Sequence, residues 1–113
     1  MDVKIIKFKT PDGTYLDGLL RYKKEKKEKV IIAIHGMASN CFKKREKTIS
    51  KYASDIGIDT FVFNNRGSDI VRYLKKEKIS SGSDNIGGSA YENVYESYYD
   101  IKGAILQILE LGY

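Results

Sequence analysis

Several residue types are scarce in this chain of 113 residues, and each scarcity argues against a class of protein. A single cysteine, Cys41, cannot form an internal disulfide, which argues against a small secreted scaffold and favours a cytoplasmic location. One histidine and one cysteine are too few for an ordinary metal site, and no phosphate-loop or dinucleotide fingerprint occurs, so no cofactor is expected. No apolar run approaches the roughly 20 residues that cross a bilayer, so no membrane partner is expected.

Lysine, by contrast, is abundant, and the net charge is +5 with a sequence pI of about 9.2. The lysine clusters at 23–29, 43–47 and 75–78 contain interleaved acids, a pattern typical of solvated loops and helix ends. Nine tyrosines and the positive charge leave a nucleic-acid binder open as one interpretation, but no RNP-like or helix-turn-helix pattern supports it. Nucleic acid is therefore not the partner that we expect.

The N-terminal region predicts a β-hairpin over residues 3–22. Residues 3–9 favour a strand, and "TPDG" at 10–13 is a turn signal, because proline fixes φ and glycine accepts a positive φ. The following segment places Leu16, Leu20 and Tyr22 on one face at the period of a strand. The charged residues 23–29 then form an exposed connection.

A strand–helix–strand unit follows the hairpin. The run "VIIAI" opens a β-strand at 30–35, and its lack of alternation indicates a strand covered on both faces, as in a parallel sheet. A second buried strand is expected at 59–64. Between them lies a helix at about 45–56, with these apolar residues at helical spacing: Ile49, Tyr52, Ala53 and Ile56.

The remaining chain predicts a long loop and a final helix. Residues 65–92 are rich in glycine and serine, and a loop of this length is more often functional or mobile than inert. Residues from about 93 to 111 predict a helix in which Gly103 either permits close packing on a sheet or only weakens the helix. Its apolar stripe consists of Val94, Tyr98, Ile101, Ile105, Ile108 and Leu109. The predicted fold class is therefore α/β, a hairpin followed by a β-α-β-α arrangement.

Two polar loops follow the two strands of the parallel unit. They are "HGMASN" at 35–40 and "NNRGSD" at 64–69. Ligands bind outside the carboxyl ends of strands in an open α/β sheet, so these loops predict a ligand crevice from topology alone.

The order of these signals resembles the first part of an α/β-hydrolase. An N-terminal hairpin, "HGM" after one buried strand, "FNNRG" after the next, "GGSAYE" at 87–92 and a helix ending in "LGY" are similar to uncharacterised prokaryotic hydrolases of the esterase or acyl-hydrolase type. The resemblance covers essentially the whole chain. It implies that residues 1–113 form a partial α/β-hydrolase domain, the start of a truncated sheet, and that the complete family acts on a small acyl or ester substrate.

The resemblance also implies roles for individual residues. The backbone N–H of Met37 becomes one donor of an oxyanion hole, and such a donor stabilises the charge that develops on a carbonyl under attack. His35 precedes it and holds the loop in shape; the less favoured alternative makes it a general base. The other residues expected to shape the site are Gly36, Asn40, Asn65, Arg66, Gly67 and Asp69. Loop capping by the asparagines and aspartate, and a structural ion pair of Arg66, remain open alternatives.

The expected nucleophile elbow, Gly-x-Ser-x-Gly on a strand-to-helix turn, is not in the chain. "GGSAY" at 87–91 has Tyr91 where the second glycine belongs, and Ser68 has no identifiable base. Cys41 has lysines nearby that could lower its pKa, but no second histidine to work with. Triad serine, acid and histidine are all missing, so we expect a gene remnant, a split gene or a shortened sequence that is inactive alone.

The resemblance further implies that strand 30–35 lacks its next neighbour. An exposed apolar edge invites pairing with another chain, so we expect self-association or a completing chain at that edge. A non-catalytic protein-binding module that uses the crevice or this edge is the alternative function.

Overall fold

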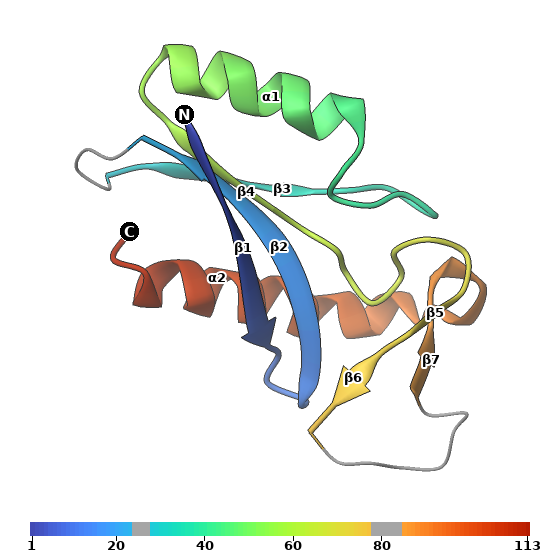
Figure 1. Cartoon of the computed structure of the whole chain (residues 1–113). Helices are drawn as coiled ribbons and strands as arrows, with labels where there is room; N and C mark the ends of the chain where they lie inside the picture. Colours follow the sequence, from blue (N-terminus) through green and yellow to red (C-terminus); the bar gives the residue numbers. More distant parts are fainter. Residues whose placement is uncertain (24–27, 78–84) are drawn as a thin grey trace.

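The computed structural model describes residues 1–23, 28–77 and 85–113, and it places a mixed β-sheet between two helices (Figure 1). The main strands are β1 (Asp2–Lys9), β2 (Thr14–Tyr22), β3 (Val30–Ile34) and β4 (Asp59–Phe63), in the order β1-β2-β4-β3. The helices are α1 (Lys44–Asp55) and α2 (Ser97–Glu110). The short elements are β5 (Arg72–Tyr73), β6 (Lys75–Lys76), β7 (Ile86–Gly87) and 3₁₀ turns at Ser89–Tyr91 and Val94–Glu96. The α/β class predicted from the sequence is confirmed.

The hairpin pairs β1 with β2 in antiparallel register, from Asp2↔Tyr22 to Lys9↔Tyr15. Its turn is closed by Thr10, whose N–H donates to the Thr14 carbonyl over 2.8 Å, and by Gly13, whose φ is +86°. Only glycine accepts such a φ without strain. The turn therefore has the chemistry that its sequence predicts.

β3 and β4 are parallel, with Val30 opposite Asp59 and Ile34 opposite Phe63, and α1 connects them. The prediction that the first of these strands is covered on both faces is wrong. None of its five residues is buried, and the Ile34 side chain is 47% exposed. The reason is its place in the sheet, since β3 is the last strand of the order and has β4 on one side only.

The face of the sheet toward α2 carries the main apolar core. Aromatic rings of Phe8, Phe61 and Phe63 pack edge-to-face or stacked at centroid distances of 5.7–6.1 Å. Gly103 lets α2 approach the hairpin, because a Cβ there would lie 3.0 Å from the Thr10 Cα, so the close-packing interpretation of this glycine holds. The buried members of the core are Ile6, Phe8, Leu16, Leu20, Phe61, Phe63, Ala104 and Ile108.

The face toward α1 is partly polar, and the predicted apolar stripe of that helix is only partly confirmed, because Ala53 is buried but two other members are not. Tyr52 and Ile56 are 67% and 73% exposed, and the buried residues of α1 are Glu46, Ser50 and Ala53. The cause lies in the sheet, which presents two polar side chains to the helix. The Ser50 hydroxyl donates to the Glu46 carbonyl and accepts from Thr60 Oγ1 (2.7 Å) and Arg21 Nη1 (3.3 Å).

The C-terminal region also differs from its prediction. The expected loop at 65–92 contains three short strands, of which β6 pairs with β2 and β5 pairs with β7. Gly82 and the neighbouring serines of that prediction lie outside the described residues. On α2, the stripe is only partly buried because Asp100, Gly103 and Ala104 share the inner face. The stripe members left exposed on α2 are Tyr98, Ile105 and Leu109. The predicted start near residue 93 is wrong, since Val94, also exposed, lies in the 3₁₀ turn that precedes α2.

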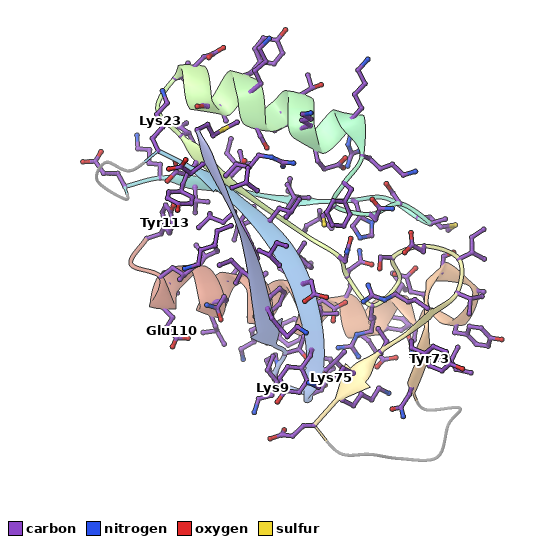
Figure 2. All side chains as sticks on the ribbon, viewed as in Figure 1. Lys9, Lys23, Tyr73, Lys75, Glu110 and Tyr113 are labelled. Atoms are coloured by element: carbon purple, nitrogen blue, oxygen red, sulfur yellow. The ribbon has the colours of Figure 1, made fainter. Side chains whose placement is uncertain are left out.

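At one end of the sheet, side chains far apart in sequence are joined by hydrogen bonds. Asp59 accepts hydrogen bonds from the Lys23 N–H (3.1 Å) and the Tyr113 hydroxyl (2.5 Å), and Figure 2 shows Lys23 and Tyr113 at the same end of the sheet. Lys9 and Lys75 lie at the opposite end (Figure 2). Neither helix of the described ranges is both long enough and apolar enough to span a bilayer.

Candidate functional site

The loops that follow β3 and β4 lie side by side, because the two strands are parallel neighbours. Four hydrogen bonds join the loops directly. They are Asn65 N–H to His35 Nε2 (3.2 Å), Cys41 N–H to Asn64 Oδ1 (2.7 Å), Asn40 Nδ2 to Asp69 Oδ1 (3.1 Å) and Asp69 N–H to Ser39 O (3.0 Å). Residues 35–41 and 64–69 are therefore one connected unit at the carboxyl end of the parallel pair.

His35 uses both ring nitrogens within this unit, and its side chain is nearly buried. Nε2 accepts the Asn65 N–H, so in a neutral ring Nδ1 carries the proton and donates it to the Gly36 carbonyl at 2.9 Å. That hydrogen-bond network assigns the tautomer. An imidazole held this way has no free nitrogen for proton abstraction. The geometry favours the loop-shaping interpretation of His35 over the general-base alternative.

Met37 stands at the tip of a tight turn formed by Gly36–Ser39. The Ser39 N–H donates to the Gly36 carbonyl over 3.2 Å, and Ala38 has a φ of +56° whereas the φ of Met37 is not positive. The closing hydrogen bond and the positive φ at the third residue match a type II turn. The Met37 side chain is 85% exposed, and its amide donates to no acceptor among the residues that the structure describes.

Arg66 points away from the loops into a cluster of three carboxylates. Its Nε and its backbone N–H bind the two oxygens of Asp100, at 2.8 and 2.9 Å. Its terminal nitrogens bind both oxygens of Asp12 at 2.8 Å, and Nη1 also binds Glu96 at 2.7 Å. The guanidinium is thereby a buried tie between the hairpin turn, the β4 loop and α2. This arrangement supports the structural ion pair over a place in the crevice wall.

Burial and pairing move the carboxyl groups of this cluster in opposite directions. Burial raises the pKa of Asp100 above its ordinary value, and the hydrogen bonds and charge of Arg66 offset this only in part. Asp12 is less buried; burial pushes its pKa up, but hydrogen bonds from Arg66 and Thr10 outweigh this and leave the pKa lowered.

The remaining site candidates serve mainly the shape of the β4 loop. Gly67 is buried under a carboxylate, since a Cβ there would lie 2.4 Å from Cδ of Glu92. Asp69 takes a φ of +59° and holds Asn40. Asn65 differs, because its Oδ1 is buried and has no hydrogen-bond partner within the described ranges. Leaving such an oxygen unpaired costs about 1–3 kcal/mol, so it marks a polar position that local structure does not explain.

The two nucleophile candidates are both committed to structure. The Ser68 hydroxyl is fully buried and accepts a hydrogen bond from Arg72. Cys41 is 1% exposed, and burial raises the pKa of its thiol to about 11, so the nearby lysines do not activate it. Among the described residues, no hydroxyl or thiol lies beside a free imidazole.

Two further candidates for a functional role are a metal site and the "GGSAY" segment. In the part of the chain that the structure describes, no three His, Cys, Asp or Glu side chains gather in a way that could hold a metal ion. Ser89 of the "GGSAY" segment donates its N–H to the Asp69 carbonyl over 2.9 Å and so ties this segment to the β4 loop. Sequence reasoning missed Asn64, Glu92 and Asp100, because each acts across a distance in sequence that no local pattern encodes.

Comparison with solved structures finds a protein of similar fold. The alpha/beta hydrolase GrgF from Penicillium sp. sh18 is similar in structure, with a TM-score of 0.53 and 21% sequence identity. The likeness covers 68% of this chain and 25% of that chain, so the present chain spans about a quarter of GrgF. No protein-family profile and no curated protein matches the sequence. The likeness shows a hydrolase-like fold.

Proposed function

We propose that this chain is the N-terminal part of a serine hydrolase of the esterase or acyl-hydrolase type, and that it supplies one oxyanion-hole donor, the Met37 amide. The observation that carries the proposal is the type II turn at Gly36–Ser39, which holds that amide without a partner among the described residues. Preorganised donors are the largest single contribution to many acyl-transfer reactions. The hydrolase-like fold that the chain shares with GrgF is consistent with this proposal.

The chain alone is proposed to be inactive toward acyl and ester substrates. Its single histidine is bound at both nitrogens, and Ser68 and Cys41 are buried. The nucleophile, acid and second histidine would come from a completing segment. The free, buried thiol of Cys41 also supports a cytoplasmic location, where thiols stay reduced.

The decisive experiment removes the backbone N–H of Met37, the proposed donor. Met37→Pro deletes the N–H, and proline is the favoured residue at this second position of a type II turn, so the loop keeps its shape. Met37→Ala is the matched control, because it removes the side chain and keeps the amide. In the protein completed by the segment encoded downstream of codon 113, we expect kcat on p-nitrophenyl esters to fall about 10²–10³-fold for proline and little for alanine.

Two results would contradict the proposal. Equal kcat for the proline and alanine variants would show that the Met37 amide does not contact the oxyanion. Ester turnover by the purified chain alone, abolished by a serine-directed phosphonate, would show that a nucleophile is present after all. A downstream reading frame without a Gly-x-Ser-x-Gly elbow would favour the second function below.

The second candidate is a protein-binding module, which the free edge of β3 specifically favours. The Lys29 carbonyl accepts from the Asp59 N–H, so Lys29 faces β4. Backbone groups alternate along a strand, so those of Val30 and Ile32 point outward, and no strand of the described ranges pairs with them. Below the edge lies a hollow of about 520 Å³, whose apolar lining includes Ile31, Ile32, Ile58, Ile105, Ile108 and Leu109.

An extended segment of a second copy or of a completing chain would pair with β3 and place an apolar side chain in this hollow. Sedimentation and amide exchange test the pairing together. We expect the isolated chain to self-associate, with slow exchange at Val30 and Ile32 only when it is associated or completed. A folded monomer with slow exchange across Val30–Ile34 would refute edge pairing.

A further inference from the structure

A second hollow lies on the opposite side of the sheet, between the N-terminus of β1 and helix α1. Its volume is about 660 Å³, within the range of small-molecule sites. Figure 1 shows the start of β1 directly beneath α1. The residues that line the hollow are Met1, Phe42, Lys44, Lys47, Thr48 and Lys51. None of them belongs to the loops that carry the proposed oxyanion donor.

The lining combines positive charge with apolar surface. Lys44, Lys47 and Lys51 follow one another at three- and four-residue spacing, so they share one face of α1. None of the three forms an ion pair with another described residue. Phe42 and Met1 are 68% and 58% exposed, and lysine stems are themselves apolar up to the ammonium group.

The lysines also stand where they weaken the helix. Lys44 and Lys47 occupy the first turn of α1, where the helix dipole disfavours cations. Glu46 is the acid of that turn, and it is already paired with Arg45. The helix's free N–H groups add to the positive potential there. An anionic ligand would offset this unfavourable concentration of charge.

We propose that this groove binds a single-chain anionic amphiphile, such as an alkyl carboxylate, sulfate or phosphate. The headgroup would lie among the lysines, and the alkyl chain would cover Phe42 and Met1. A bare inorganic anion would leave these apolar side chains uncovered. Nucleic acid fits less well, because the neighbouring guanidinium of Arg45 is already held by Glu46 and the Ile34 carbonyl. A bilayer needs a flat or protruding surface, and this one is hollowed.

Titration calorimetry on the full chain tests the proposal with three ligands below their micelle concentrations. Dodecanoate carries both features, dodecyltrimethylammonium has the chain with opposite charge, and butanoate has the headgroup with little chain. We expect saturable 1:1 binding of dodecanoate and at least about tenfold weaker binding of the other two, because both apolar burial and charge contribute. Equal affinity for either partial ligand would overturn the proposal.

Variants locate the site. Lys47→Glu with Lys51→Glu should weaken dodecanoate binding about tenfold or more, and Phe42→Ser about tenfold, whereas Phe42→Leu should retain most of it. Lys4→Glu with Lys102→Glu is the matched control, since it changes the net charge equally at exposed positions outside the groove. Thermal unfolding confirms that each variant is folded.

Three further outcomes would each overturn the proposal. Equal weakening by the control pair would mean general attraction to a positive chain. Binding to phosphatidylglycerol vesicles without binding to monomeric dodecanoate would assign the surface to a membrane. Binding to an oligonucleotide that depends on the same lysines, again without dodecanoate binding, would assign it to nucleic acid.

Discussion

The two faces of the sheet are held to their helices by different kinds of contact. The α2 face is closed by aromatic and aliphatic side chains around Phe61, which is fully buried. The α1 face is closed by hydrogen bonds centred on Ser50, with a small apolar cluster of Leu19, Cys41 and Val62 beside it. Apolar packing is not directional and depends mainly on the volume of the side chains, whereas a buried polar group depends on the presence and position of its hydrogen-bond partners. The faces should therefore respond differently to substitution.

The largest effect is expected from a cavity on the α2 face. Phe61→Ala removes a ring that packs against Phe8 and Phe63, and should lower the free energy of unfolding by about 3–5 kcal/mol. A small domain has little more than this in total, so Phe61→Leu gives the measurable case, at about 1–2 kcal/mol. Urea unfolding followed by circular dichroism reports both. A loss below 1 kcal/mol for the alanine variant would mean that this face is not the main core.

On the α1 face, removing one partner of a buried hydrogen bond should lower the free energy of unfolding more than removing both partners. Ser50→Ala leaves the Thr60 hydroxyl and the Arg21 guanidinium without an acceptor, at a cost of about 1–3 kcal/mol. Adding Thr60→Val removes the stranded hydroxyl, so the double variant should regain part of that loss. The same unfolding measurement gives the coupling free energy between the two sites. Strict additivity would contradict a hydrogen-bonded layer on this face.

The Arg66 cluster is a polar anchor of the α2 face, and acid should weaken it. The folded-state pKa of Asp12 is lowered from its usual value near 3.8, so its stabilising contribution is full above that pH and is lost as pH falls. Asp12→Asn should lose about 1 kcal/mol at pH 7 and less at pH 3. The raised pKa of Asp100 makes stability fall as pH rises, the opposite dependence. Because Asp100 is present in the native protein and in the Asp12→Asn variant, its contribution largely cancels in their difference. A difference independent of pH would show that Asp12 acts only through its shape.

The smallest effect is a local one, reported by the thiol of the α1 face. Because Cys41 is buried with a pKa of about 11, its reaction with a disulfide reagent should require opening of the loop between β3 and α1 and should accelerate with rising pH. Ser50→Ala should speed the reaction several-fold through weaker α1 packing, at about 1 kcal/mol of opening free energy. Phe61→Leu should change it less. Equal acceleration by both variants would mean that the faces open together.

This contrast also explains what the sequence could and could not predict. Period-two alternation placed Leu16 and Leu20 correctly in the core, and turn chemistry located the hairpin. The predicted inner stripe of α1 is right at Ala53 but wrong at Tyr52 and Ile56. The buried Ser50 was missed because its partners Thr60 and Arg21 lie on distant strands. A hydrophobic pattern cannot register a polar layer. For the same reason, the two ring contacts of His35 could not be predicted, since one of them comes from the β4 loop.

One contact on the edge strand limits any chain that pairs there. Arg45 Nη2 donates to the Ile34 carbonyl at 3.3 Å and to Oε1 of Glu46 at 2.6 Å, and the second oxygen of that buried carboxylate has no partner among the described residues. A strand that extended past Ile32 would have to displace the guanidinium and leave the carboxylate uncompensated. Such a buried charge is costly, so the Arg45–Glu46 ion pair limits how far along β3 an added strand can pair.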